Sequence, residues 1–267
     1  MKKIVIVGGD NRFLHLYKKL KEKGLKVESL GLFSNDNADL SVADVVILPI
    51  PASRDKIHIT APLTNREILV ADIENKIPEN ALVLSGGNPF NNRKVTDYLK
   101  LDDYAILNAI PTAEGAIAYA IENTQKMLFK SNVLVVGFGR VGKVLANRLY
   151  ALGAKVTVSA RNLFDKGLIK AFGYDYSKTQ NLNNDLKNYD IIFNTLDFSV
   201  LDDKTVKAIN PELIIDLSTK GGINFEFAEN SGIKATKLPA LPAKTAPYTA
   251  AEILFYTIYN LLPFKGE

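Results

Sequence analysis

Three closely spaced glycines after an apolar run are the residues whose types and spacing most clearly predict chemistry in this sequence. Residues 132–146 read NVLVVGFGRVGKVLA, an apolar strand pattern followed by a helical one. Gly137 permits the tight turn after the strand, Gly139 lets the backbone approach a pyrophosphate, and Gly142 lets the helix pack closely on the strand. The first amide groups of that helix would also attract an anion. We therefore predict dinucleotide binding by the whole loop, that is by Gly137, Phe138, Gly139, Arg140, Val141 and Gly142.

The end of the next apolar run predicts which dinucleotide is bound. NAD sites usually place an acidic residue about 20 positions after the glycines, where it binds the ribose 2′-hydroxyl. Here the run ends with Ser159, Ala160 and Arg161, and no carboxylate stands among them. A hydroxyl and a guanidinium suit a 2′-phosphate, so we predict NADP as the cofactor. The alternative is that Arg161 is a surface residue after a strand.

Two later strand ends complete the predicted cofactor site. Parallel strands place their carboxyl ends at one edge of the sheet, where open α/β sheets bind ligands. Asn194, Thr195 and Leu196 follow one predicted strand and are expected along the nicotinamide half of the cofactor. Ser218 and Lys220 follow the next strand. We expect Ser218 to contact the cofactor, and Lys220 to be either a catalytic and substrate-binding cation or a solvated lysine.

The first half of the chain offers groups that could bind an anionic substrate. Asp10 and Arg12 come directly after the first apolar run and its glycines. Arg12 is either a carboxylate clamp at the ligand edge of the sheet or a solvated helix residue. A glycine-rich turn over 85–88 follows another predicted strand, and its backbone amides suit a carboxylate unless it is a plain turn. This turn contains Ser85, Gly86, Gly87 and Asn88.

Further candidate groups stand at two predicted helix starts. Pro111 precedes Thr112, which could cap a helix over 112–129 and give it an N-terminus that attracts an anion. Glu114, in the first turn of that helix, could accept a proton as a catalytic group or simply complement the helix dipole. Thr249 lies in the first turn of a predicted last helix and contacts either substrate or solvent.

The histidine and cysteine counts exclude several classes of site. The chain has no cysteine and only two histidines, His15 and His58. Thiol nucleophiles, disulfides and three-histidine metal sites therefore cannot form, and we predict no metal site. Both histidines are expected to be structural or surface residues. Because no histidine follows residue 58, dehydrogenases that need a histidine base in their C-terminal half are disfavoured.

Length and composition define the class of protein. With 267 residues, of which 47% are hydrophobic and 23% charged, the chain is expected to fold as two domains or one large one. The net charge of +4 is dispersed, so no nucleic-acid partner is predicted. The first apolar run is too short for a signal peptide, and no run is long enough to span a membrane. We therefore expect a cytoplasmic protein.

The alternation of short apolar runs with helical patterns predicts the elements that position these groups. Strands joined by helices indicate parallel sheets with right-handed crossovers. In the first half, strands are expected at 3–9, 27–32, 45–50, 82–85 and 105–108, and helices at 11–23 and 91–100. In the second half, strands are expected at 132–136, 155–159, 191–194 and 213–216, and helices at 141–152 and 246–262.

The predicted fold is therefore a two-domain α/β fold. An N-terminal flavodoxin- or Rossmann-like domain over 1–111 would bind substrate, and the last helix, within about 246–267, would pack back on it and complete it. The linking helix and a Rossmann-type NADP-binding domain would occupy 112–245.

Other motifs stand in a fixed order around the glycine-rich loop. They are SGGN at 85–88, IPTAEG at 110–115, DLSTKGG at 216–222 and the proline- and alanine-rich segment 241–250. In this order and spacing, nearly the whole chain resembles the family of dipicolinate synthase A subunits from spore-forming Gram-positive bacteria. The chain departs from the family pattern at Ala240, Ala243 and Ala251, where the family has glycines.

The resemblance implies a reaction and partners. Family members oxidise a partly reduced pyridine-2,6-dicarboxylate, from the dihydrodipicolinate branch of the lysine pathway, to dipicolinate, with NADP as the hydride acceptor. They act with a second, flavoprotein-like component, the dipicolinate synthase B subunit, in the mother cell during sporulation. The resemblance therefore implies a small dicarboxylate substrate and a hetero-oligomer.

Two other interpretations stay open on the residues. A different two-domain NADP-dependent dehydrogenase, similar to shikimate or alanine dehydrogenase, would use the same cofactor domain. A non-catalytic module that senses NADP would need no substrate-binding groups, and the anion-binding candidates around residues 85, 112 and 220 count against it.

Overall fold

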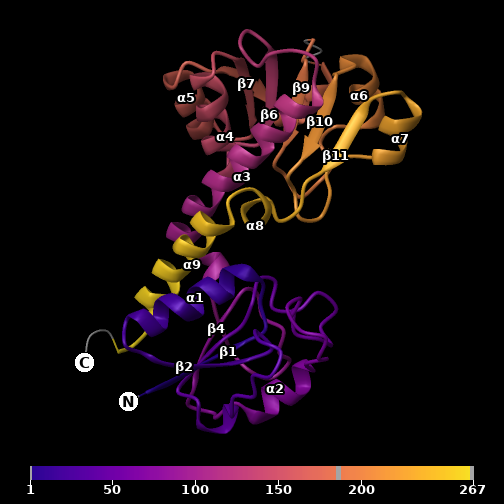
Figure 1. The fold of residues 1–267 in the computed structure, drawn as a ribbon. Helices are drawn as coiled ribbons and strands as arrows, with labels where there is room; N and C mark the ends of the chain where they lie inside the picture. The colour runs from indigo at the N-terminus through magenta and orange to yellow at the C-terminus, as the bar shows by residue number, and fades with distance from the viewer. Residues whose placement is uncertain (1, 185–187, 265–267) are drawn as a thin grey trace. The chain divides into compact units, whose positions relative to one another are not determined.

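The computed structural model describes residues 2–184 and 188–264, and the chain divides into two compact units. Unit 1 consists of Met1–Asn108 together with Ala246–Glu267, and unit 2 consists of Ala109–Thr245. The boundaries predicted above lie between 111 and 112 and near 246. Each unit is built on its own parallel sheet (Figure 1).

Unit 1 contains a five-stranded sheet with the order β2-β1-β3-β4-β5, in which all paired strands are parallel. The strands are β1 (Lys3–Val7), β2 (Lys26–Leu30), β3 (Val45–Ile47), β4 (Leu82–Ser85) and β5 (Thr96–Asp97). The helical elements are α1 (Asn11–Glu22), η1 (Leu40–Val42), α2 (Val70–Lys76), η2 (Tyr98–Lys100) and α9 (Pro247–Leu261). The first four strands, α1 and α9 confirm the elements predicted there.

Both faces of this sheet are covered, which explains why its inner strands are continuous apolar runs. Ile4 and Ile6 of β1 belong to the core that contains α1 and α9, whereas Val5 and Val7 belong to the core that contains α2. Figure 1 shows α1 and α9 side by side over the sheet and α2 on its other face. The prediction that the last helix packs on the N-terminal unit is confirmed.

Unit 2 contains a six-stranded parallel sheet with the order β11-β10-β9-β6-β7-β8. The strands are β6 (Asn132–Val136), β7 (Lys155–Ala160), β8 (Asp175–Lys178), β9 (Ile191–Asn194), β10 (Leu213–Asp216) and β11 (Lys234–Lys237). Helix α3 (Asp102–Asn123) begins in unit 1 and enters unit 2 at Ala109. The other helical elements of unit 2 are α4 (Arg140–Ala151), α5 (Leu163–Ala171), η3 (Thr179–Asn184), α6 (Asp203–Ile209), α7 (Phe225–Asn230) and α8 (Leu241–Thr245).

The strand order of unit 2 is that of a doubly wound, Rossmann-like fold. The chain leaves β6 toward β7 and β8 on one side and returns to β9, β10 and β11 on the other, so the order reverses at β6. In such sheets ligands bind at the carboxyl ends of the strands beside this reversal. The glycine-rich loop leaves β6 at that point. The fold therefore confirms the predicted class and positions the loop at the ligand edge.

Helix α3 corrects three predictions near the junction of the two units. Residues 105–108 are not a strand, and the linking helix neither begins at Thr112 nor continues to 129. One helix runs from Asp102 to Asn123 with Pro111 in its interior, so Thr112 is not an N-cap and its predicted anion-attracting helix start is wrong. Buried residues recur at helical spacing both before and after Pro111. They are residues 104, 109, 113, 116, 117 and 120. The stability gained by burying them exceeds the cost of the backbone hydrogen bond that the proline cannot donate.

The predicted helix over 91–100 is also wrong. Residues 96–97 form β5 and residues 98–100 form the short turn η2. The carboxylate of Asp97 explains the difference, because it accepts hydrogen bonds from the amides of Gly87 and Leu99, both at 3.1 Å. An Asp side chain that bonds nearby backbone in this way stabilises a turn in competition with a helix.

Replacing Ala240 by glycine is expected to stabilise unit 2. Ala240 has a φ of +58°, a region in which a Cβ costs about 1–2 kcal/mol. Glycine removes that cost but has more freedom to lose on folding, worth roughly 0.5–1 kcal/mol. We expect a net gain of about 0.5–1 kcal/mol in the free energy of unfolding, measured by urea titration.

The control is Ala243→Gly, because Ala243 lies in α8 and a helical glycine costs about 1 kcal/mol relative to alanine. The two substitutions are chemically identical and should shift stability in opposite directions. Shifts in the same direction would contradict the left-handed conformation of Ala240.

Candidate functional site

The glycine-rich loop joins β6 to α4 with the geometry that a pyrophosphate site requires. Gly137 has a φ of +101°, and a side chain there would press on Thr195 and Leu196. A Cβ at Gly142 would overlap the carbonyl oxygen of Gly137, so helix and loop pack as closely as their backbones allow. Among the described residues, a Cβ at Gly139 would meet nothing within 4 Å. The space in front of Gly139 is therefore open, and the loop fits a bound dinucleotide.

The first turn of α4 follows the glycine-rich loop and adds backbone amides that suit an anion. Gly139 is the N-cap of this helix and provides no side-chain cap for its first amide groups. Amides of this kind, with the helix dipole behind them, attract phosphates. Arg140 and Val141 form the first turn of α4. The positive end of a 12-residue helix thus lies directly after the open glycine.

A cavity of about 230 Å³ lies over the loop, between the ends of β6 and β7. Most of its lining residues are cofactor-site candidates predicted from the sequence, and the structure brings them together. The cavity is lined by Gly137, Phe138, Gly139, Ser159, Ala160, Arg161, Asn162, Asp165, Thr179 and Leu196. Asn162, Asp165 and Thr179 were not predicted, because they follow β7 and β8 in segments without a recognisable motif.

Ser159, near the end of β7, is hydrogen-bonded to the glycine-rich loop. It is fully buried, and its hydroxyl oxygen accepts hydrogen bonds from the Gly137 amide at 3.3 Å and from the Thr179 hydroxyl at 3.2 Å. These contacts connect the ends of three neighbouring strands. Ser159 therefore holds the glycine-rich turn in position at the base of the cavity.

Arg161 lies at the rim of the cavity. Its guanidinium carbon is 5.2 Å from the centre of the Phe198 ring, a cation–π distance that orients the side chain. One carboxylate, Asp165, lines the same cavity. It accepts a hydrogen bond from the Asn162 side chain at 2.8 Å and lies 4.0 Å from the Lys143 ammonium, so nearby polar groups offset its charge.

The end of β9 is joined to the loop and to β10 by side-chain hydrogen bonds. The Thr195 hydroxyl donates to the Val136 carbonyl at 2.9 Å. The Asn194 amide donates to the Leu196 carbonyl and to the Asp216 carboxylate, both at 2.9 Å. Asp216 is fully buried and was missed from the sequence, although it ends a strand directly opposite Asn194 in the register. It positions the β9 loop rather than facing solvent.

Ser218 and Lys220 lie on the loop after β10. The Ser218 hydroxyl accepts a hydrogen bond from the Gly221 amide at 3.0 Å, and the Lys220 side chain is exposed. Asp197 ties this loop to the β9 loop by accepting from the Thr219 amide at 2.6 Å and the Lys220 amide at 3.3 Å. Partial burial alone would raise the pKa of Asp197, but these hydrogen bonds hold it below its ordinary value.

The IPTAEG motif lies in the middle of α3 and has a packing role. A Cβ at Gly115 would overlap the side chain of Thr245, so this glycine lets α3 approach α8 closely. Glu114 is half exposed, and its Oε1 lies 3.7 Å from Nε of Arg148. Because Glu114 is far from the start of the helix, the interpretation that it complements the helix dipole is wrong.

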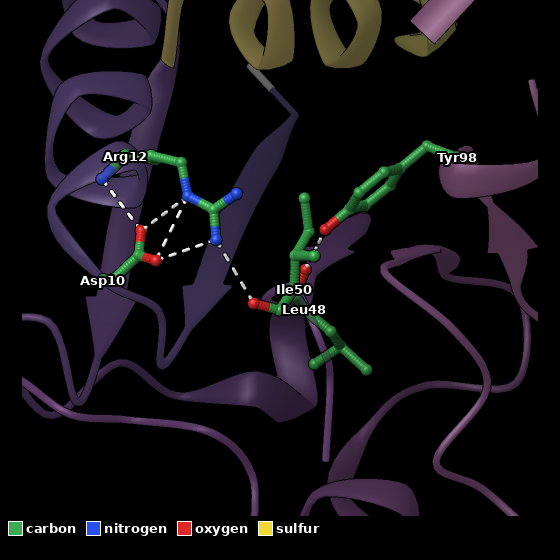
Figure 2. A network of polar contacts seen from close by, with 5 residues as sticks. All are labelled: Asp10, Arg12, Leu48, Ile50 and Tyr98. Carbon is green, nitrogen blue, oxygen red and sulfur yellow. Dashed lines mark hydrogen bonds and ion pairs between the residues drawn. The ribbon is translucent and has the colours of Figure 1, made fainter. Parts of the chain in front are cut away.

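In unit 1, buried Arg12 forms an ion pair with partly exposed Asp10 at the start of α1 (Figure 2). The Asp10 carboxylate accepts from Nε of Arg12 at 3.0 and 3.1 Å and from Nη2 at 2.8 Å. Nη2 also donates to the Ile50 carbonyl at 3.3 Å. Burial alone would lower the pKa of Arg12, but the hydrogen bond and charge of Asp10 raise it above its ordinary value. Arg12 is 7% exposed, so the interpretation as a solvated helix residue is wrong.

The turn over 85–88 is bonded within the chain. The Ser85 hydroxyl donates to the Gly87 carbonyl, and the Gly86 amide donates to the Pro49 carbonyl at 3.2 Å. The Gly87 amide donates to Asp97, as described above, and the Asn88 side chain bonds the backbone of residues 90 and 93. These groups stabilise the turn, so the structure does not present Gly86 and Gly87 as a ready amide cradle for a carboxylate.

The remaining candidates of unit 1 lie on α1, α9 and the loop after β3. His15 pairs with Glu252 of α9, whose Oε1 is also 3.3 Å from the Lys19 ammonium. Thr249 lies in the exposed first turn of α9. His58 is exposed, and its Nδ1 lies 2.7 Å from the Asp55 carboxylate.

His58 is expected to titrate above its ordinary pKa. The hydrogen bond to Asp55 raises the pKa of His58 because it favours the protonated ring. The raised pKa means that this contact stabilises the loop below pH about 6.5 and is lost as the pH rises through the folded value. With only two histidines in the chain, NMR titration of the ring protons resolves this value, and Asp55→Asn should return it toward about 6.5. An unchanged titration in Asp55→Asn would contradict the contact.

Two further features of the described residues bear on the class of protein. In the ranges 2–184 and 188–264, no group of three or more acidic or histidine side chains is arranged to hold a metal ion. No helix in these ranges is both long enough and apolar enough to cross a membrane.

Fold and site together define the class: a two-unit α/β protein whose second unit is a dehydrogenase-like, nucleotide-binding Rossmann domain. Residues 119–243 match the family model of shikimate / quinate 5-dehydrogenase. Residues 3–106 match the model of the N-terminal domain of the dipicolinate synthase A subunit. The chain is also 32% identical to the A subunit of dipicolinate synthase from Bacillus subtilis (strain 168), over 97% of this chain and 95% of that protein. The chain belongs to the family of dipicolinate synthase A subunits.

Solved structures agree with this assignment. The crystal structure of the dipicolinate synthase A subunit from Bacillus halodurans superposes with a TM-score of 0.90 at 32% identity, covering 98% of each chain. The crystal structure of the corresponding chain of dipicolinate synthase from Bacillus subtilis superposes with a TM-score of 0.89, covering 97% of this chain and 95% of that one. The resemblance inferred from the sequence motifs is therefore confirmed.

Proposed function

We propose that this chain is the NADP-dependent oxidoreductase component that converts a partly reduced pyridine-2,6-dicarboxylate to dipicolinate during sporulation, in the cytoplasm of the mother cell. The observation that carries the proposal is an open glycine-rich loop at the ligand edge of a dehydrogenase-like domain, in a chain of the dipicolinate synthase A-subunit family.

The residues of unit 2 support the choice of NADP. The loop 137–142 and the amides at the start of α4 would bind the pyrophosphate, and Arg161 at the rim of the cavity would bind the 2′-phosphate. Asn194, Thr195, Leu196 and Ser218 would lie along the rest of the dinucleotide. The bound cofactor supplies the hydride acceptor, and the chain supplies orientation and charge.

The remaining candidates would handle the substrate. A dicarboxylate needs cationic or hydrogen-bonding groups, and Arg12 and Lys220 are the cations at strand ends that we propose for this role. Formation of the aromatic ring releases a proton as well as a hydride. Glu114, which lies beside Arg148, is the proposed proton acceptor. Thr249 is proposed as a secondary substrate contact. The interior helix position of Thr112 and the internal bonding of the turn over 85–88 remove the reasons for assigning them this role.

The family assignment also supports a partner. We propose that the chain assembles with the B subunit of dipicolinate synthase, which is flavoprotein-like, and that the two form a hetero-oligomer. Neither nucleic acid nor membrane is part of this proposal.

The proposal is tested by mixing the purified chain with dihydrodipicolinate and NADP, with and without the B subunit. The absorbance of NADPH and the amount of dipicolinate formed are followed together. We expect both to rise in step in at least one mixture. NADP binding without absorbance change in either mixture would contradict the proposal and favour the sensing module.

A second candidate is a shikimate-dehydrogenase-like reaction, which the family match over residues 119–243 favours. The same assay with shikimate in place of dihydrodipicolinate separates the two. NADPH formation from shikimate alone would support this candidate over the first.

A further inference from the structure

We propose that Arg12 and Tyr104 form a subsite for one carboxylate group in unit 1, with Nη1 of Arg12 and the Tyr104 hydroxyl as its two donors. The inference deepens the proposed function and rests on it, because it names the groups that bind one end of the dicarboxylate. It adds Tyr104, which lies in the first turns of α3.

The guanidinium of Arg12 is fixed and only partly used. Its Nε and Nη2 bond Asp10, and Nη2 also bonds the Ile50 carbonyl. In Figure 2 the third nitrogen, Nη1, points away from these partners. In the described part of the chain, Nη1 has no hydrogen-bond partner, although the residue is 7% exposed. Nη1 is not among the fully buried side-chain atoms that lack a partner in the described residues, so it keeps some contact with solvent and a ligand can reach it.

Tyr104 presents a second donor, and its hydroxyl oxygen is likewise not fully buried. It is 2% exposed, and within residues 2–184 and 188–264 its hydroxyl has no hydrogen-bond partner. It belongs with Tyr98 to a core cluster against which Ile50 packs, and the Ile50 carbonyl bonds Arg12. The electrostatic influence of Arg12 and Asp10 on Tyr104 agrees with this placement. Burial raises the pKa of Tyr104 to about 12, against the opposing effect of Arg12. The hydroxyl therefore stays protonated near neutral pH and can donate.

The neighbouring Tyr98 has a structural role, because its hydroxyl bonds the backbone. Its ring packs edge-on against that of Tyr104, with 5.9 Å between the ring centres. Its hydroxyl is fully buried and donates to the Leu48 carbonyl at 2.7 Å (Figure 2). Two tyrosines thus share one cluster, and the fold uses the hydroxyl of only one of them. The other is available to a ligand.

The charge of the cluster favours a carboxylate over a phosphate. Asp10 already neutralises Arg12, so the pair is neutral overall and has no net positive charge to balance the second negative charge of a phosphate. One guanidinium nitrogen and one hydroxyl also supply few donors for the three oxygens of a phosphate. A planar monoanionic carboxylate, with two oxygens, matches them. Asp10 acts here as a positioning residue for Arg12.

The experiment compares the two tyrosines by calorimetric titration of the full chain with pyridine-2,6-dicarboxylate, without dinucleotide. Tyr104→Phe should weaken binding by about 10-fold or more, because a charge-assisted hydrogen bond is lost, and should leave Tm unchanged or raised. Tyr98→Phe should lower Tm by about 3–5 °C and leave the affinity unchanged. Arg12→Lys, which keeps the charge but leaves one nitrogen in place of three, should also weaken binding.

Three results would overturn the subsite. They are equal affinity of Tyr104→Phe and the unaltered chain, equal losses for the two tyrosine variants, and inorganic phosphate binding as tightly as the dicarboxylate. The proposed function is judged separately by NADPH formation. Turnover with unchanged affinity in Tyr104→Phe rejects only the subsite, whereas the expected affinity losses without turnover reject only the reaction.

Discussion

Gly142→Ala is expected to destabilise unit 2 and to abolish dinucleotide binding. The added Cβ would overlap the Gly137 carbonyl oxygen, which is a backbone atom and cannot move without shifting the loop. Overpacking a tight contact costs typically 1–3 kcal/mol, and a backbone obstacle places the cost near the upper end, at about 3 kcal/mol. For a unit of this size we expect Tm to fall by about 10 °C. The displaced loop would no longer bring its amides to the pyrophosphate.

Gly139→Ala is the matched control, because the same atom is added to the same loop in open space. Its backbone φ of −78° suits alanine, so the free energy of unfolding should change little. The expected loss is at most about 1 kcal/mol, because alanine is a poorer N-cap residue than glycine. Its Cβ would instead occupy the space of the pyrophosphate, so the affinity for NADP should fall by at least about 10-fold. Thermal unfolding and titration with NADP measure the two effects. Tight NADP binding by Gly139→Ala would contradict the placement of the pyrophosphate on this loop.

The contrast between these glycines explains why the nucleotide site could be predicted from the sequence. The strand, the three glycines and the helix are local in the chain, and each glycine has a separate steric reason that follows from the spacing alone. Parallel strands then bring Ser159, Asn194 and Asp216 to one edge, because their carboxyl ends must meet there. The role of Asp216 and the hydrogen-bond partners of Ser159 and Asn194 were found only in the structure.

The elements that were predicted wrongly depend on contacts distant in sequence. Pro111 and the short run AILN at 105–108 suggested a helix start after a strand, yet buried contacts along the whole segment keep one helix continuous. Asp97 converts a helical pattern into a turn by bonding Gly87, ten residues earlier in the chain. Neither effect leaves a local signal. The same is true of Tyr104, which belongs to a core cluster together with residues of β1 and α1 that lie far earlier in the chain.

The substrate groups could be predicted only in part for a related reason. Arg12 was identified by its place after a strand, but its burial and its pairing with Asp10 distinguish a fixed clamp from a solvated residue. The turn over 85–88 carries an equally suggestive pattern, and its donors prove to be bonded internally. A glycine-rich turn at a strand end therefore predicts a ligand site only where its amides lack partners in the chain.

Arg161→Asp is expected to weaken NADP binding by roughly 1–3 kcal/mol, about 5- to 150-fold, and NAD binding far less. The guanidinium is the cation that lines the cavity at its rim, and a carboxylate there would repel the 2′-phosphate while accepting the 2′-hydroxyl of NAD. Asp165 already lines this cavity, so a second carboxylate would strengthen the repulsion.

Lys170→Asp provides the matched control for this charge reversal. Lys170 is exposed in the last turn of α5 and does not line the cavity, so its reversal changes the net charge of the chain equally without touching the site. Titration of each variant with NADP and with NAD at one salt concentration gives the ratio of the two affinities, which screened long-range charge does not alter. The ratio should fall in Arg161→Asp and stay constant in Lys170→Asp. Equal weakening of both cofactors by Arg161→Asp would mean that Arg161 does not contact the 2′-phosphate, and that its cation–π contact with Phe198 serves the loops alone.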